Sequence, residues 1–164
     1  MSFRLTLALF AMIAAGRTAR AQDQPVITLR RTACLGRCPV YSLEIFEDGF
    51  IRYVGIEYVQ AKGERRAVVP RDAVENLVAS FLRADYFALQ DSYETCIAPD
   101  GSVSMVSDLP SQYTSLRVAT RKKSVRNYVC APRRLRELET EIDRVANTKR
   151  WIGSNLLNVP PPKL

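Results

Sequence analysis

The first half of the chain alternates apolar and polar side chains, a pattern typical of β-strands with one buried face. The clearest case is residues 41–46 (YSLEIF), and residues 26–31 (VITLRR) show the same alternation. Asp48 and Gly49 supply the Asp-Gly pair of a tight hairpin turn. This turn predicts that residues 50–54 return beside the strand at 41–46.

Two further pairs of strands are predicted along the chain. Residues 57–61 and 65–69 flank a glycine and predict a second hairpin. Residues 113–120 and 124–129 also have strand-like patterns, and the basic residues 121–123 (RKK) are expected to form the tip that joins them. Strands connected by hairpins favour a mostly antiparallel sheet.

Apolar residues recur with helical spacing in two segments. At residues 70–84 they fall at positions i, i+3, i+4, i+7 and i+8, which gives one apolar face. Pro132 begins a second such segment, which ends near Asn147. Residues 85–112 are rich in turn-forming residues and predict a long irregular loop. We therefore expect an α+β fold, a mostly antiparallel sheet with two helices packed on one face and disulfides that staple it.

The N-terminus has the layout of a secretory signal peptide. Arg4 precedes an apolar run at 5–15, and the small-residue step Ala-Arg-Ala follows at 19–21. The run is shorter than the ~20 residues that span a bilayer, so we expect cleavage after residue 21 and an exported, periplasmic or secreted product without a transmembrane segment. An uncleaved membrane anchor is the alternative. Residues 22–152 are expected to form one domain, and the Pro-rich residues 153–164 a disordered tail.

Composition limits the chemistry that the protein can perform. The 164 residues include no histidine, which excludes Ser-His-Asp, Cys-His and His-based zinc-protease sites. The seven glycines are scattered singly, so no Gly-rich phosphate loop is present. We therefore expect neither enzymatic activity nor a cofactor or metal. Acid–base chemistry by paired carboxylates is the open alternative, and the candidates in the predicted loop are Asp91, Glu94, Asp100 and Asp108.

Four segments together resemble a bacterial family of small, mostly exported domains, catalogued as domain of unknown function 6438. They are RTACLGRCPVYSLEIFEDG at 31–49, DLP at 108–110, NYVCAP at 127–132 and LETEIDRVANTKRW at 138–151. The positions that match the family pattern are Arg31, Thr32, Cys34, Gly36, Cys38, Pro39, Tyr41, Asp48, Gly49, Asp108, Pro110, Tyr128, Ala131 and Pro132. The resemblance implies a domain identity and no activity. Cys96 lies in a loop longer than is usual in the family, and Cys130 stands where a glycine is common, so these two look like an added disulfide.

The four cysteines all lie after the predicted cleavage site. An even number in an exported chain indicates two disulfides, for which three pairings are possible. A helical turn between Cys34 and Cys38, eased by Gly36, brings their Cα atoms near 6 Å, within disulfide range. We favour this local staple, which leaves Cys96 to pair with Cys130. A thiol–disulfide redox or metal-thiolate site at Cys34 and Cys38 is the alternative.

Charge is concentrated in one segment. The chain has a net charge of +7, which becomes +4 when residues 1–21 are removed, because they contain three arginines and no acid. Residues 117–136 contain no acid and eight basic residues, which are Arg117, Arg121, Lys122, Lys123, Arg126, Arg133, Arg134 and Arg136. Such a segment suits an anionic envelope component or an acidic protein. Nucleic acid is not expected as a partner of an exported protein. We favour an ordinary solvated surface whose charge is balanced by neighbouring acids, with anion binding as the alternative.

The sequence thus predicts an exported bacterial protein that acts as a non-catalytic binding or structural module of the cell envelope. Two alternatives are a redox or metal-thiolate protein that uses Cys34 and Cys38, and an inhibitor of a secreted enzyme, a role that small rigid exported domains suit.

Overall fold

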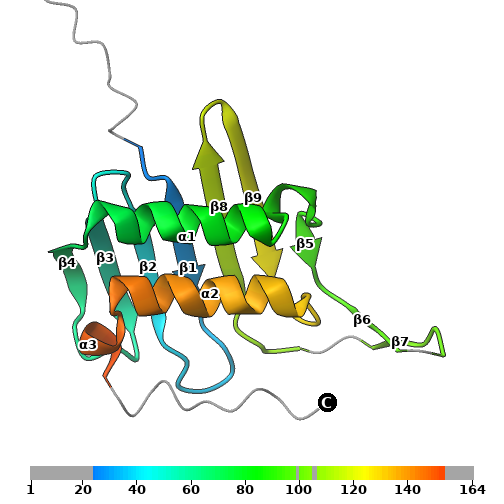
Figure 1. Cartoon of the computed structure of the whole chain (residues 1–164). Coiled ribbons are helices and arrows are strands. Elements are labelled where there is room, and N and C mark those ends of the chain that lie inside the picture. Colours follow the sequence, from blue (N-terminus) through cyan, green and yellow to red (C-terminus); the bar gives the residue numbers. More distant parts are fainter. Residues whose placement is uncertain (1–23, 99, 105–106, 154–164) are drawn as a thin grey trace, which may run out of the picture.

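The computed structural model describes residues 24–98, 100–104 and 107–153. As predicted, this part of the chain is an α+β fold in which two long helices lie on one face of a mostly antiparallel sheet (Figure 1). The predicted signal peptide at 1–21, and all but Gly153 of the predicted tail at 153–164, lie outside the described residues.

The main sheet has seven strands in the order β4-β3-β2-β1-β8-β9-β5. Its six longer strands pair with one another in antiparallel orientation. They are β1 (Ile27–Arg31), β2 (Val40–Ile45), β3 (Phe50–Glu57), β4 (Gly63–Val68), β8 (Gln112–Val118) and β9 (Arg121–Asn127). The first strand therefore lies near the middle of the sheet, between β2 and β8.

The region that follows β3 differs from the prediction. The hairpin expected between 57–61 and 65–69 is wrong, because β3 continues to Glu57 and pairs directly with β4. The strand ends where Tyr58 adopts a left-handed backbone conformation, with φ of 50°. Two residues further on, the backbone N–H groups of Gln60 and Ala61 donate to carbonyls of α3 (Lys149–Ile152), near the C-terminal end of the described chain.

The segment at 85–112 is more regular than predicted. It contains the 3-10 helix η2 (Tyr86–Ala88) and the short strands β5 (Ser92–Tyr93), β6 (Cys96–Ile97) and β7 (Val103–Ser104). β5 extends the main sheet parallel to β9, whereas β6 and β7 pair with each other. Two-residue strands are too short to show an alternating pattern, which is why the sequence did not reveal them.

The turn between β8 and β9 is formed by Ala119 and Thr120, and Ala119 has a left-handed φ of 51°. The predicted basic tip at 121–123 is therefore wrong, since these residues begin β9. Because these residues lie on a strand and not in the turn, their side chains point alternately to the two faces of the sheet.

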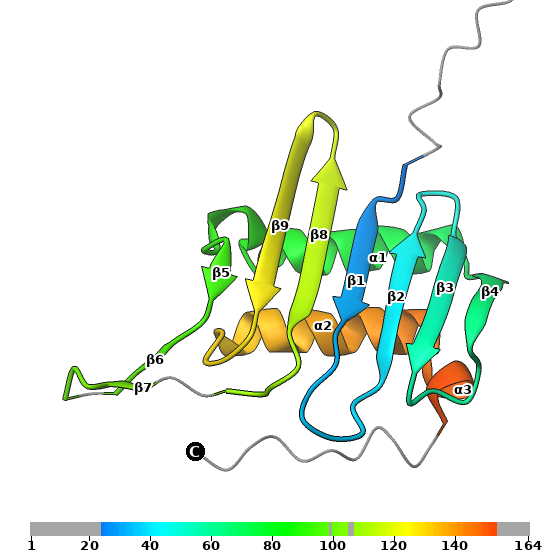
Figure 2. The ribbon, with the colours of Figure 1, turned by 180° about the vertical axis from the view of Figure 1, so that it is seen from behind.

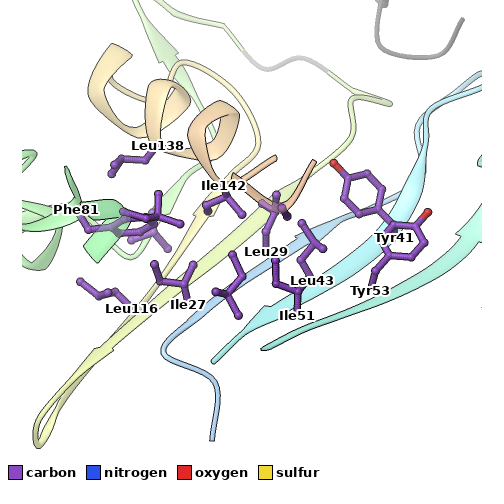
Figure 3. Close-up of a cluster of buried hydrophobic side chains, with 14 of the residues drawn as sticks. Ile27, Leu29, Tyr41, Leu43, Ile51, Tyr53, Phe81, Leu116, Leu138 and Ile142 are labelled. Carbon is purple, nitrogen blue, oxygen red and sulfur yellow. The ribbon is translucent and has the colours of Figure 1, made fainter. Parts of the chain in front are cut away.

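The two predicted long helices are confirmed as α1 (Arg71–Arg83) and α2 (Arg133–Ala146), and a short α3 (Lys149–Ile152) follows. Their apolar faces pack on alternate residues of the strands, and Figure 3 shows this core. Phe81 of α1 and Ile142 of α2 are fully buried against strand residues such as Leu29. Burial of each such side chain stabilises the fold by about 1.5–3 kcal/mol.

Candidate anion-binding surface

The sheet has one face covered by α1 and α2 and a second face over which no described helix lies (Figure 2). Successive strand residues point to opposite faces, and the buried residues identify the covered one. We call the second face the open face. Its polar and charged members on the six longer strands are Thr28, Arg30, Ser42, Glu44, Arg52, Glu64, Arg66, Tyr113, Ser115, Arg117, Lys122, Ser124 and Arg126.

Cations outnumber acids on these strands of the open face by six to two. Two of the cations are paired with the two acids, since Arg52 binds Glu44 and Arg66 binds Glu64, each at 2.6 Å. The guanidinium group of Arg117 donates to backbone carbonyls of the residues that precede β1. The open face thus keeps an excess of positive charge.

Near the end of the open face where β1 ends and β8 begins lies a stack of guanidinium groups and tyrosine rings, which we call the Arg–Tyr stack (Arg30, Tyr113, Arg126 and Tyr128). Arg30 Cζ lies 4.1 Å from the centroid of the Tyr113 ring. Arg126 Cζ lies 5.8 Å from the Tyr113 centroid and 5.5 Å from that of Tyr128. Cation–π contacts of this kind hold the flat guanidinium groups in place.

The two arginines of the stack differ in their acidic partners. Arg126 binds Glu94, which follows β5, at 2.8 Å. Arg30 is exposed and forms no ion pair with any residue that the structure describes. A guanidinium group presents a planar fork of N–H donors that matches a carboxylate or phosphate. The Arg30 fork is therefore available to an anion from outside.

The sequence did not predict three of the six open-face cations. Arg30, Arg52 and Arg66 lie on β1, β3 and β4, far along the chain from residues 117–136. Their alternation with buried residues is visible in the sequence, but it says nothing of which strands become neighbours. The strand order of the sheet brings them together.

The structure places the eight cations that the sequence grouped on three different parts of the fold. Arg117, Lys122 and Arg126 lie on the open face. Arg121 and Lys123 point to the covered side, where Arg121 Cζ lies 3.8 Å from the centroid of the Phe87 ring and Lys123 pairs with Asp91.

The other three predicted cations, Arg133, Arg134 and Arg136, lie at the N-terminus of α2, in the layer of helices. Arg133 binds Glu137 at 2.6 Å, and Arg136 donates to the carbonyl of Ala131 at 2.7 Å. A shallow open depression along this helix is lined by three bases, two acids and a threonine, which are Arg133, Arg136, Arg144, Glu137, Glu141 and Thr140. Its mixed charge favours no anion.

Both predicted disulfides are formed, and no described cysteine is free. The Cα atoms of Cys34 and Cys38 are 5.8 Å apart, and those of Cys96 and Cys130 are 5.3 Å apart. The turn between Cys34 and Cys38 is a bend rather than the predicted helical turn. It passes through Gly36 at a φ of 141°, which L side chains rarely adopt. No helix begins at either cysteine, so the usual activation of a redox thiolate is missing.

Arg31 is the centre of a hydrogen-bond network on the covered face. Its guanidinium group donates to Asp143 at 2.6 Å, Tyr41 at 2.8 Å and Gln112 at 2.5 Å. Asp143 also accepts from the hydroxyls of Tyr41, at 2.7 Å, and Thr148, at 3.0 Å. Burial acts to lower the pKa of Arg31, but the Asp143 carboxylate acts against this and holds that pKa above its ordinary value. The network thus joins β1 and β2 to α2.

Glu139 on α2 belongs to the same buried region. Its carboxylate accepts two hydrogen bonds from the Asn127 amide, at 2.8 and 3.0 Å. Burial raises the pKa of Glu139 to about 7, although the Asn127 bonds and the charge of Arg31 act to lower it. Such a shift often marks an active site. Glu139 is only 2% exposed, however, so it is closed to a substrate in this conformation.

Three of the four candidate loop acids have partners other than a second carboxylate. Asp91 binds Lys123, Glu94 binds Arg126, and Asp100 accepts from the backbone N–H of Ser102 at 2.9 Å. In the described ranges, no three cysteine, aspartate or glutamate side chains are placed to hold a metal ion together.

Comparison with known protein families shows which family the domain belongs to. The model of a domain of unknown function, DUF6438, matches residues 25–146. The chain belongs to this family. A comparison with curated proteins finds no match. None of the helices that the structure describes has both the length and the apolar composition of a membrane span.

Several residues by which the sequence resembles DUF6438 meet at the end of the sheet where β1 ends and β8 begins. Thr32 and Ser111 bind each other twice, through Thr32 N to the Ser111 carbonyl at 3.0 Å and Ser111 N to Thr32 Oγ1 at 2.8 Å. The Asp108 carbonyl accepts from Leu35 N at 3.0 Å, and the Tyr128 hydroxyl accepts from Leu109 N at 3.3 Å. In this DUF6438 domain, these residues fix the loops around the disulfides.

Proposed function

We propose that the protein is an exported, non-catalytic binding module of the bacterial cell envelope, and that its open face binds an anionic component. One observation carries the proposal. The open face has six cations against two acids on its longer strands, and Arg30 near the end of β1 is exposed and without an ion pair in the described chain. Exposed cations on one surface attract anionic partners and raise their rate of association.

Two features support export. The N-terminal residues have the charge, apolar run and small residues of a signal peptide. Two disulfides are formed, and structural disulfides are typical of proteins in oxidising compartments outside the cytosol. Isolation of the protein from the periplasm or medium with an N-terminus at Gln22 would support export. Intact Met1 on soluble protein would contradict it.

Binding is tested with the exported protein and a panel of anionic probes, namely alginate, poly-glutamate and phosphatidylglycerol vesicles, each with a neutral counterpart. We expect binding to at least one anionic probe at low salt, with an affinity that falls as salt rises because exposed charges are screened beyond about 8–10 Å at physiological ionic strength. Absence of binding to every anionic probe at low salt would contradict the proposal.

A second candidate function, inhibition of a secreted enzyme, is favoured by one feature. Leu35 is 84% exposed in the loop that the Cys34–Cys38 disulfide closes. A rigid loop that presents an apolar side chain suits the pocket of an enzyme, because little conformational entropy is lost on binding. The test is a panel of secreted proteases and glycosidases. Inhibition that Leu35→Ala removes would favour this function, and the absence of inhibition would reject it.

A further inference from the structure

We propose that the open face binds an extended polysaccharide that carries carboxylates. Arg30 holds one carboxylate with its available fork, and Arg126 holds a second in exchange for its ion pair with Glu94. The inference rests on the proposed function and specifies its ligand and its site. It follows from the spacing of the cations, the side chains between them and the shortage of apolar surface around them.

The spacing of the two arginines fits a polymer with repeated charges. Arg30 on β1 and Arg126 on β9 are both cross-strand partners of Tyr113 on β8. They are thus separated by two strand spacings, or about 9–10 Å along the row. The Cζ atoms of the two guanidinium groups lie 4.1 and 5.8 Å from the centroid of the Tyr113 ring, so a chain with a carboxylate on successive or alternate sugars spans the row and contacts both.

Hydroxyl groups lie beside this row. Thr28 and Ser115 face each other at 2.6 Å between their side-chain oxygens, and Ser124 is the cross-strand partner of Ser115. Ser42 is the cross-strand partner of Arg30. A hydroxyl both donates and accepts hydrogen bonds, which matches the many hydroxyls of a sugar chain better than it matches a ligand that only accepts.

The distribution of apolar side chains argues against a protein or a membrane as the ligand. The exposed apolar residues of the open face lie on β3 and β4, where Ile56 is 51% and Val68 76% exposed. Around the Arg–Tyr stack, the Tyr113 ring is covered by Arg30. Stable protein interfaces have an apolar centre, and interfacial membrane binding inserts apolar side chains. The stack offers neither.

Stacking on tyrosine also makes the site specific for arginine. A lysine at position 30 keeps the charge but loses the planar fork and the flat contact with Tyr113. Arg30→Lys is therefore a sensitive probe, because a site that needs charge alone tolerates the change and a site that binds carboxylates through two parallel bonds does not.

The experiment measures binding of alginate to the exported protein by titration calorimetry, with neutral dextran, poly-glutamate and phosphatidylglycerol vesicles as comparisons. The double variant Arg30→Gln/Arg126→Gln is expected to weaken alginate binding by about tenfold or more, since it loses charge-assisted hydrogen bonds. The matched control Arg133→Gln/Arg134→Gln removes the same charge from the helix layer and should change affinity less than about twofold. Thermal melts confirm that each variant is folded.

The outcomes separate this inference from the proposed function. Tightest binding to alginate, lost in the open-face variant and weakened by Arg30→Lys, supports it. Tightest binding to vesicles or to poly-glutamate overturns the polysaccharide while the proposed function stands. If Arg30→Gln/Arg126→Gln and the control Arg133→Gln/Arg134→Gln lose alginate affinity equally, the proposed site is overturned. If none of the anionic probes binds, the proposed function fails as well.

Discussion

Arg30 and Arg31 are neighbours in the chain and have opposite surroundings. Arg31 lies on the covered face, where Asp143, Tyr41 and Gln112 all accept from its guanidinium group. Arg30 lies on the open face, stacked on Tyr113 and exposed. The hydrogen-bonding capacity of Arg31 is used within the fold, and that of Arg30 remains available. A one-residue step along a strand thus separates a structural arginine from a candidate binding arginine.

The largest effect that we expect from a single substitution tests this contrast directly. Arg31→Gln should lower the free energy of unfolding by about 3 kcal/mol, because it leaves Asp143 partly buried without its cation. Arg30→Gln should change it by less than about 0.5 kcal/mol, as exposed substitutions usually do. Urea unfolding of the two variants measures both values. Similar losses in the two variants would remove the distinction between the faces.

The disulfides allow a test of whether stability and binding are separate. Replacing Cys96 and Cys130 by serine should lower the free energy of unfolding by about 4 kcal/mol, and replacing Cys34 and Cys38 by serine should lower it by about 2 kcal/mol. The difference arises because the Cys96–Cys130 disulfide closes the longer loop. Wherever a variant remains folded, binding at the open face should persist. Catalysed thiol exchange that disappears in the Cys34 and Cys38 variant would instead favour the redox alternative.

The covered face should also make stability depend on pH. The folded state holds the Glu139 proton up to about pH 7, whereas an unperturbed glutamate releases it near pH 4.5. The folded state therefore binds this proton more tightly, and stability falls as pH rises through that window. At about 1.4 kcal/mol per pKa unit, the loss is about 3 kcal/mol.

Glu139→Gln should flatten this part of the stability profile, which urea unfolding at pH 5 and pH 7.5 measures. The groups around Glu139 are Asn127, Arg31, Asp143 and Arg136. Binding by Arg30 and Arg126 should not change over the same range, because arginine stays charged throughout. An unchanged pH profile in the variant would show that Glu139 is not the group responsible.

The smallest expected effect separates two adjacent cations of β9. Arg121→Gln should lower the free energy of unfolding by about 0.5–1 kcal/mol, because the side chain stacks on Phe87. Lys122→Gln should leave stability unchanged and weaken anion binding slightly, because Lys122 lies on the open face. A thermal melt and an alginate titration of each variant make the comparison. The reverse pattern would mean that the register of β9 is shifted by one residue.

The fold class, both long helices and the main hairpins follow from local patterns, because periods of two and of 3.6 residues are properties of short segments. The disulfides follow from spacing and from the number of cysteines. The strand order does not, since no local pattern states that β1 lies beside β8. Hence the site was predicted only in part. Arg117, Lys122 and Arg126 were found as part of a charged run, while Arg30 was missed because the segment around it has ordinary charge.

The central position of β1 has a consequence for how the chain folds. Thr28 and Ser115 lie side by side, yet they are 87 positions apart in the sequence. As the chain is made from its N-terminus, β1 to β4 are complete long before β8 exists, and pairing across so long a separation is slow. Until β8 arrives, one edge of β1 presents unpaired N–H and C=O groups. Such an edge recruits other strands, so association between incomplete chains should begin at β1.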